Sequence, residues 1–358
     1  MYPFYKKYER HLTTIAFIGG FVFDSLTLQR IDRWFEHLIL ILYLGFSAFA
    51  IIIYNSFDGE RERTSRFGKT AGKVIWWFPV AIQFAFGAVF SGSLVFYSRS
   101  ASLSVSWPFL TLLVAFAVGN EVVRSRYGRL AWQVYALFVV VFLYSSFSMP
   151  IVLKSIDVFS FIASGFASVA IVGIVVHAIR WIEPERFRYS RAGIWAGIAV
   201  LYAGFNIFYF LNLIPPLPLS LREIGIYHSI ARVPDGDYAL SYERAPWYRF
   251  RTISPEFHTA EGTAAHAFSS VYAPVGFSLD IIHEWFYRGT DGRWISAGKI
   301  SFPIVGGRGG GYRGYSSKTV FPGEWKVEVN TLHGATIGRT AFKVTDTSDF
   351  LPLETLAR

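Results

Sequence analysis

Seven long apolar runs within residues 1–214 constrain the fold of this chain more than any other feature. A helix needs about 20 apolar residues to cross about 30 Å of hydrocarbon. The qualifying runs are 12–28, 35–56, 74–97, 106–123, 130–151, 156–179 and 192–213. The first is the weakest, because it is short and contains Asp24, and we interpret it as a retained span rather than a cleaved signal peptide. Tryptophans near the predicted ends are typical of membrane interfaces.

The loop charges predict an orientation for these spans. If the N-terminus is cytoplasmic and seven spans alternate, the cytoplasmic segments hold 15 Lys/Arg and the opposite side holds 4. Such a bias follows the positive-inside rule. We therefore expect a multi-pass protein with the lipid bilayer as its surroundings and with its C-terminal part on the far side of the membrane from the cytoplasm.

The basic excess belongs to the apolar half of the chain. The formal charge is +9 overall, but it is +8 up to Ile214 and only +1 from Pro215 onward. Orientation of the spans explains this excess, so nucleic acid is not an expected partner. The chain has no cysteine, which excludes disulfides, thiolate catalysis and cysteine-ligated zinc.

The pattern changes after the last apolar run. Residues 215–222 are proline-rich and predict a semi-rigid hinge. Residues 223–345 contain seven or eight short segments that alternate with period two and are separated by turn residues. This pattern predicts an antiparallel, immunoglobulin-like β-sandwich. The predicted strands are Glu223–Ile230, Tyr238–Ser241, Tyr248–Ile253, Ala264–Tyr272, Ile281–Tyr287, Trp294–Ser301, Glu324–Asn330 and Thr336–Val344. Residues 346–358 are expected to be a loosely ordered tail.

Residues 281–344 resemble a C-terminal domain of unknown function found in bacterial multi-pass membrane proteins. The matching features are the His283–Trp285 step, the Gly311–Lys318 stretch GYRGYSSK, the strand around Trp325, and the closing Gly338–Val344. Gly20–Leu28, Asn120–Glu121 and Pro215–Leu219 in the first half also look like that family. The resemblance implies a bacterial inner-membrane protein with a periplasmic β-domain. It supplies no active site, because the family is uncharacterised.

Four polar residues in the apolar half are candidates for an intramembrane site: Asp24, Gln83, Glu121 and His177. Ionisable groups in spans are costly and often functional. The structural alternatives are interfacial ion pairs for Asp24 and Glu121, and an interfacial position for His177. Small and hydroxyl residues in the third span (Ser91, Gly92, Ser93) and in the fifth (Ser145, Ser146, Ser148) are typical of close helix packing. Convergence of the four residues would favour transport, whereas dispersal would favour an anchor.

The β half offers a second candidate set. The glycine-rich stretch Gly306–Gly314 and its flank place Arg308, Arg313, Ser316 and Lys318 together in sequence, and such a set could hold an anionic ligand. The alternative is a glycine-rich hairpin between two strands. His283 and Trp285 complete the candidate ligand-binding residues. His228, His258, His266 and His283 lack the spacing of a metal motif, so we predict neither a metal nor any other cofactor.

These observations predict a non-enzymatic protein. The helices would anchor a periplasmic β-domain that binds an envelope partner, which would be a protein, a glycan or a lipid headgroup. The alternative is a transporter or flippase for a lipid-linked or small anionic substrate. A membrane-embedded enzyme is a third hypothesis, although no hydrolase motif supports it. No oligomeric state is predicted.

Overall fold

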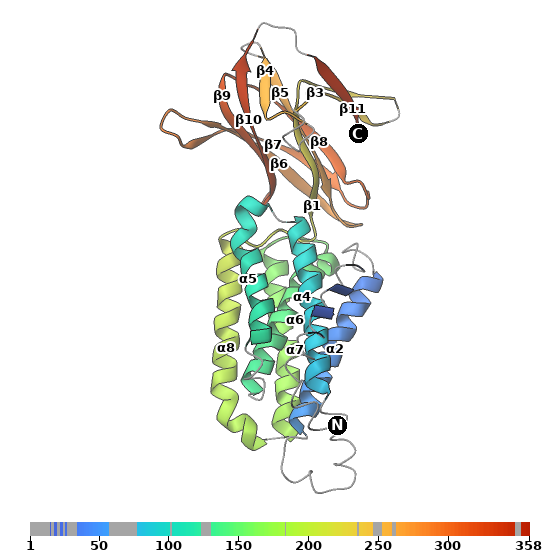
Figure 1. The fold of residues 1–358 in the computed structure, drawn as a ribbon, viewed down its shortest axis with the longest axis vertical. Helices are drawn as coiled ribbons and strands as arrows, with labels where there is room; N and C mark the ends of the chain where they lie inside the picture. Colours follow the sequence, from blue (N-terminus) through green and yellow to red (C-terminus); the bar gives the residue numbers. More distant parts are fainter. Residues whose placement is uncertain are drawn as a thin grey trace. The chain divides into compact units, whose positions relative to one another are not determined.

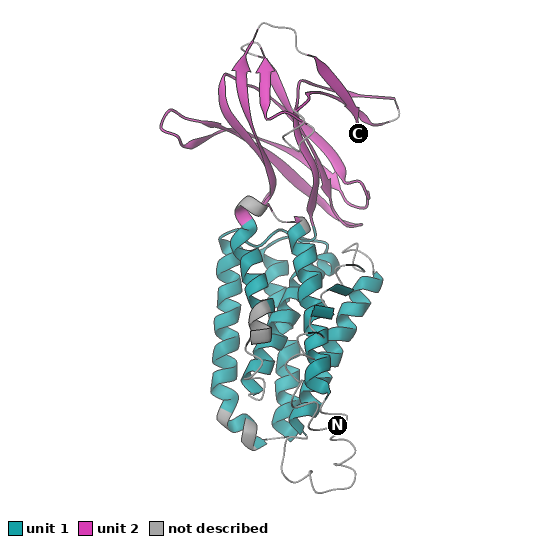
Figure 2. Cartoon of the chain, viewed as in Figure 1, with its two compact units in different colours: residues 1–98, 106–218 teal, residues 99–105, 219–358 magenta. Residues whose placement is uncertain are grey.

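The computed structural model divides the chain into two compact units (Figure 2). One comprises Met1–Ser98 with Ser106–Pro218, and the other Arg99–Val105 with Leu219–Arg358. The structure describes six single residues between 15 and 26 and the stretches 34–56, 77–100, 102–122, 130–182, 184–234, 236–245, 253–259, 263–347 and 352–358.

The first unit is helical over most of its described residues (Figure 1). Its helices are α2 (Trp34–Ser56), α4 (Phe78–Ser100), α5 (Leu103–Val122), α6 (Leu130–Leu153), α7 (Val158–Ile182) and α8 (Pro184–Phe210). Each coincides with one predicted span. Five contain a stretch long and apolar enough to cross a membrane, and α5 contains the shorter apolar segment Val105–Ala117. The seventh predicted span, 12–28, lies almost wholly outside the described residues.

Helix α6 packs against α2, α7 and α8 and is buried over most of its length. The ring of Phe142 stacks on Phe205 of α8, with centroids 4.3 Å apart. Glycine allows a second close contact, because a Cβ at Gly197 would lie 2.3 Å from the ring of Tyr135. Small residues at such contacts are the usual means of close helix packing in lipid.

Several polar side chains inside the helical unit bond to one another or to the backbone. Asn55 Nδ2 donates to Gln133 Oε1 at 2.6 Å, and the hydroxyls of Tyr97 and Ser146 lie 2.5 Å apart. Ser164 donates to the carbonyl four residues earlier. These contacts fit the packing role expected for the hydroxyl residues of the apolar half.

The second unit consists mainly of strands. They are β1 (Ser220–Tyr227), β2 (Ser229–Arg232), β3 (Tyr238–Glu243), β4 (Glu256–Thr259), β5 (Ala264–Tyr272), β6 (Ser278–Arg288), β7 (Trp294–Val305), β8 (Tyr312–Thr319), β9 (Gly323–Thr331), β10 (Thr336–Asp346) and β11 (Leu353–Ala357). They form sheets in the orders β1-β5-β8, β4-β10-β9-β6-β7 and β11-β3-β2. Paired neighbours are antiparallel except β10 and β4, which are parallel.

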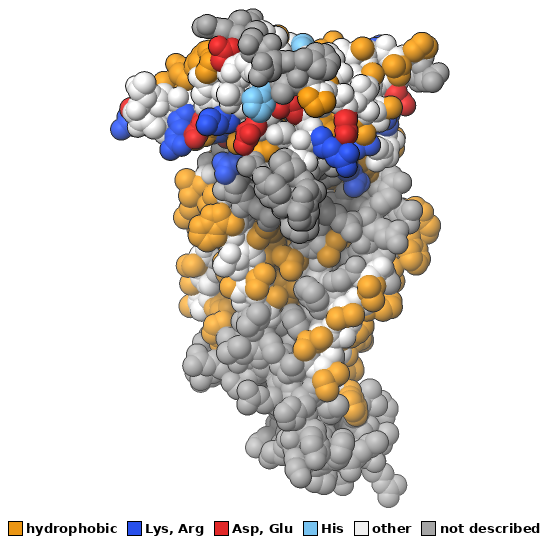
Figure 3. Space-filling model, turned by 45° about the horizontal axis from the view of Figure 1, so that its top comes forward, with side chains coloured by type: hydrophobic (Ala, Val, Ile, Leu, Met, Phe, Trp, Pro, Cys, Tyr) orange, Lys and Arg blue, Asp and Glu red, His pale blue; other side chains and the backbone are white. Residues whose placement is uncertain are grey.

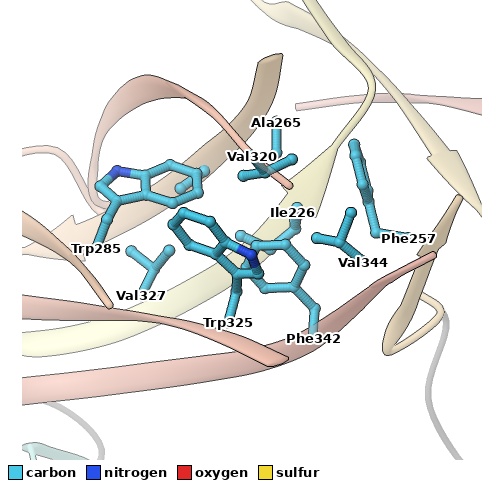
Figure 4. Close-up of a cluster of buried hydrophobic side chains, with 10 residues drawn as sticks. Ile226, Phe257, Ala265, Trp285, Val320, Trp325, Val327, Phe342 and Val344 are labelled. Carbon is cyan, nitrogen blue, oxygen red and sulfur yellow. The ribbon is translucent and has the colours of Figure 1, made fainter. Parts of the chain in front are cut away.

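The main core lies between the sheet β1-β5-β8 and the five-stranded sheet (Figure 4). Ala265 and Ala267 of β5 face Trp285 and Trp325 of the opposite sheet, and all four are fully buried or nearly so. Small residues on one sheet thus leave room for two indoles on the other. Two facing sheets with interdigitated side chains agree with the predicted sandwich.

A second cluster covers the other face of β1-β5-β8. Tyr227 and Phe268 are the sequence neighbours of Ile226 and Ala267, so they point to the opposite face. They pack with Leu240 of β3. The domain therefore has a third layer, β11-β3-β2, that the predicted two-sheet sandwich does not include.

Two predicted boundaries in this half differ from the structure. Strand β1 begins at Ser220, inside the segment predicted as hinge (215–222). The prediction of a loosely ordered tail at 346–358 is wrong over Leu353–Ala357, because β11 pairs with β3. The predicted strand Tyr248–Ile253 lies outside the described residues except for its last two positions, where Ile253 bridges to Arg244.

The interpretation of the glycine-rich stretch as a hairpin is also wrong. Residues 306–311 connect β7 in the five-stranded sheet with β8 in the sheet β1-β5-β8, so they cross between sheets. A Cβ at Gly306 would lie 1.7 Å from the carbonyl oxygen of Pro274, which explains one of the glycines by close backbone approach.

The close contact at Gly314 gives a test of the inter-sheet packing. A Cβ there would lie 2.1 Å from the ring of Phe302 on β7. We expect Gly314→Ala to destabilise the β-domain by roughly 1–3 kcal/mol, as overpacking does. Hydrogen exchange of the β8 amides in the full-length protein measures the local opening free energy. Gly309→Ala is the matched control, since a Cβ there meets nothing within 4 Å. Equal exchange in both variants would contradict this packing.

Candidate functional site

His283, Trp285 and Ser316, predicted to bind a ligand, lie together in the protein interior. His283 Nε2 is 2.7 Å from Ser269 Oγ, and its Nδ1 is 2.9 Å from Ser316 Oγ. The Trp285 indole donates to the same Ser316 oxygen at 3.0 Å. The histidine comes from β6 and the serines from β5 and β8, so the network joins the two facing sheets. Its members are buried, which makes it a structural link and not a ligand-binding surface.

The three predicted cations do not form one site. Arg308 is exposed in the loop between β7 and β8. Arg313 is ion-paired with Asp237 at 2.5 Å, on the face of β8 that points to the third layer. Lys318 points to the other face, where a Cβ at Gly298 would lie 3.5 Å from its Nζ. The alternation of β8 therefore separates groups that are close in sequence, and the structure does not bring Arg313 and Lys318 to one face.

The intramembrane candidates also do not share a site as far as the described residues show. Gln83 is buried in α4, whereas His177 is exposed on α7, where its ring lies 6.1 Å from that of Trp181. Asp24 and the side chain of Glu121 lie outside the described part of the chain. Because Gln83 is buried and His177 is exposed, the two side chains do not line one polar pathway through the helices.

A cluster that the sequence did not reveal joins two of the scattered histidines. Both ring contacts are 2.8 Å long: His228 Nε2 to Glu243 Oε1 and His258 Nδ1 to Glu243 Oε2. The backbone N–H of His258 also donates to Glu243, at 2.7 Å. Burial alone would raise the pKa of Glu243, but these hydrogen bonds outweigh it and lower the pKa. Within the described residues no group of three or more His, Asp or Glu could hold a metal ion.

A groove of about 540 Å³ lies on the β-domain. Its walls come from β1, from β10, from the segment before β4, and from the end of β11. Apolar side chains of Ile224, Ile226, Ile253, Phe342 and Leu356 line it, and Glu223, Ser254, Arg339, Thr340 and Arg358 add polar groups.

Two strand edges border this groove. Strand β1 is the outer strand of its sheet. Strand β4 pairs only with Lys343–Asp346 of β10, so the described residues provide no paired strand for Arg339–Phe342 on that side, while Gly338 lies against Leu221 of β1. Edge strands carry backbone N–H and C=O groups that can pair with an added strand. The geometry therefore suits an extended peptide.

The charges at the groove are unequal. Arg358 is paired with Glu223, with Nε 2.7 Å from a carboxylate oxygen. Arg339 is exposed, and the structure shows no hydrogen bond or ion pair for it within the described part of the chain. A guanidinium binds carboxylates through charge-assisted hydrogen bonds. Arg339 can therefore receive an acidic side chain of a bound segment.

Comparison with known proteins supports a domain of uncharacterised function. Residues 279–344, which span β6 to β10, match a family described as proteins of unknown function (DUF2914). Comparison with curated proteins returned no match. The family match over residues 279–344 agrees with the expected resemblance over residues 281–344.

Two solved structures are similar to parts of the chain. An immunoglobulin-like protein from Pseudomonas aeruginosa shares 13% identity, over 34% of this chain and 97% of its own, with a TM-score of 0.20. The alkylpurine DNA glycosylase AlkC of Pseudomonas fluorescens, bound to DNA containing an abasic site analog, shares 10% identity over 87% and 99%, with a TM-score of 0.22. At such scores neither bears on the fold or function of this chain.

The His283 network predicts a pH dependence of stability. Burial lowers the pKa of His283 to about 4 from the ordinary 6.5. Between these values the unfolded ring binds a proton and the folded ring does not. The stability from this site is thus fully present above about pH 6.5 and is lost as the pH falls through about 4. At about 1.36 kcal/mol per pH unit, the loss is about 3 kcal/mol.

Hydrogen exchange of the β6 amides in the full-length protein, measured from pH 7 to pH 4, tests this dependence once the intrinsic exchange rates are corrected. His283→Gln is expected to flatten the profile between about pH 6.5 and pH 4, because an amide does not titrate there. His333→Gln is the control, since His333 is exposed in the turn between β9 and β10. An unchanged profile in His283→Gln would show that another group carries the dependence.

Proposed function

We propose that this chain is a bacterial inner-membrane protein that anchors a periplasmic β-domain, and that the β-domain binds an extended segment of a partner protein in the groove between β1 and β10. The single observation that carries the proposal is the pair of strand edges along one groove that also contains Arg339. Of the partners considered, a protein segment fits best, because only a peptide backbone can pair with these edges along their length.

The membrane location draws support from the helices and from the distribution of charge. Among the described residues, five apolar helices are long enough to cross a bilayer. The described side chains of the helical unit visible in Figure 3 are mostly hydrophobic, and the charged ones drawn there belong to the β-domain. The excess of basic residues in alternate loops supports a cytoplasmic N-terminus and a periplasmic β-domain.

The transporter or flippase hypothesis has less support. It expects polar groups to converge inside the helices, whereas His177 is exposed and Gln83 is buried. The polar groups Asn55, Gln133, Tyr97 and Ser146 bond to one another in pairs, as packing contacts do.

The length of the groove indicates how many residues of a bound peptide it can hold. Glu223–Ile226 of β1 form one wall. Four residues in an extended strand cover about 13 Å at about 3.3 Å per residue. Alternate side chains of a bound peptide would then point toward the apolar lining and toward solvent. We expect recognition of about four to six residues with alternating apolar side chains and one acidic side chain opposite Arg339.

A library of displayed random peptides, selected against the full-length protein in nanodiscs, tests the proposal. The enriched sequences are expected to show this alternation with an acidic position. Arg339→Glu should weaken their binding about tenfold to a hundredfold, which corresponds to the loss of a charge-assisted hydrogen bond of about 1.5–3 kcal/mol.

Two variants make the peptide experiment specific. Thr340→Trp is expected to block binding, because Thr340 lines the groove and an indole there would occupy it. Arg293→Glu is the matched control for charge, since Arg293 is exposed in the turn between β6 and β7 and does not line the groove. Failure to enrich any peptide, or equal binding to the wild type and both groove variants, would refute the groove as the site.

A further inference from the structure

The turns at one end of the β-domain combine exposed apolar side chains with basic ones. Strand β1 begins at this end, because Ser220 pairs with Tyr272, the last residue of β5. The register of the other strands brings three connections to the same end: 273–277 after β5, 306–311 after β7, and 332–335 after β9.

A large aliphatic side chain is exposed in the first and third connections, and another is exposed on the last residue of β7. The exposed fractions are 74% for Val275, 59% for Val305 and 59% for Leu332. Exposed aliphatic side chains at the tips of turns bring no benefit to the fold, because they remain in water. Their removal from water is favourable only when another apolar phase covers them.

The first two connections form one tip. The Gly306 N–H donates to the Phe277 carbonyl at 2.8 Å, and the Gly307 N–H donates to that of Ala273 at 3.0 Å. A Cβ at Gly307 would lie 3.3 Å from Val275 Cγ2. The glycines thus let residues 306–311 pack against the β5–β6 turn, so Val275 and Val305 belong to two segments that are bonded to each other.

Two exposed arginines lie at this end, and the nearest acidic residues of β1 and β6 are Glu223 and Asp280. The three connections contain no Asp or Glu, and they contain Arg308. Arg222, near the start of β1, is also exposed, and its guanidinium lies over the ring of Tyr272 at 5.3 Å. Apolar tips beside arginines match the boundary between acyl chains and anionic headgroups, where aliphatic groups enter and arginine binds phosphate.

The chain itself brings this end to a membrane. Helix α8 ends at Phe210 and β1 begins at Ser220, so nine residues separate them. Fully extended, nine residues reach at most about 30 Å. The tether therefore limits how far the start of β1 can lie from the end of the last apolar helix.

We infer that Val275, Val305 and Leu332, with Arg308 and Arg222, form a surface by which the β-domain contacts anionic lipid headgroups and inserts its tips into the outer boundary of the bilayer. This surface is separate from the groove. The inference rests on the proposed membrane location and adds a second attachment that fixes the orientation of the β-domain.

Single cysteines test the inference, because the natural chain has none and a label has no competing site. Val305→Cys, Leu332→Cys and, as the control, Arg293→Cys are labelled with an environment-sensitive fluorophore in the full-length protein. The proteins are placed in nanodiscs of phosphatidylcholine alone or with phosphatidylglycerol. Labels at 305 and 332 are expected to shift to the blue and to be quenched by lipid-borne quenchers, more strongly with phosphatidylglycerol, whereas the label at 293 stays water-exposed.

The charge and the apolar tips are then tested separately. Arg308→Gln is expected to lower the ratio of inserted to exposed label at 332 about fivefold in phosphatidylglycerol discs, as expected for about 1 kcal/mol per basic residue at an anionic surface. Val275→Asp with Val305→Asp should abolish insertion at 332. Hydrogen exchange of the core strands checks that these variants stay folded.

The outcomes separate this inference from the proposed function. If the protein does not enter nanodiscs, the proposed membrane location itself fails. If it enters them but labels at 305 and 332 resemble the label at 293, the lipid-contact surface is refuted and the membrane anchor is not. Equal insertion with and without phosphatidylglycerol would refute the role of the arginines.

Discussion

Strand β5 lies between two other layers, and the rest of the β-domain depends on this double burial. Its alanines face the indoles of the five-stranded sheet, while Phe268 faces the third layer. A strand covered on both faces has no solvated side, so its sequence reads as nearly continuous small and apolar residues. The polar Ser269 is tolerated because it bonds to His283 of the opposite sheet. The side chains of β5 therefore determine how closely the layers pack. One of them, Ser269, also needs a hydrogen-bond partner in the opposite sheet.

Much of the architecture follows from the sequence, because it depends on local periodicity. Runs of about 20 apolar residues identify helices, and the predicted strand Ala264–Tyr272 coincides with β5. The features that the sequence did not predict depend on pairing between distant segments. Strand β8 has glycine and serines where a typical strand has β-branched residues, and only contacts with other strands explain them: Gly314 lies against Phe302, and Ser316 bonds to His283 and Trp285. Strand β11 was missed because a short strand owes its order to its partner β3.

The groove could not be predicted, for a related reason. Its walls come from positions near 224, 254, 340 and 357, and no spacing within the sequence connects them. The six predicted residues of the β half were selected for their proximity in sequence, and the alternation of β8 and the burial of β6 distributed them between the core and two surfaces. In a β-domain, neighbours in sequence point to opposite faces, so clustering of chemical groups along a strand is weak evidence for a site.

An open strand edge is normally a liability, because identical edges can pair and aggregate. The groove carries Arg339 and the Glu223–Arg358 pair at its rim, and charges at an edge oppose pairing between copies of the same chain. The parallel partner β4 covers only the last part of β10, since Pro255 directly before it lacks an N–H and cannot extend the pairing as a donor. The same few residues thus keep the edge available and make it selective. Because Glu223 lies only four positions after Leu219, a segment bound there would also lie at the tethered end of the domain.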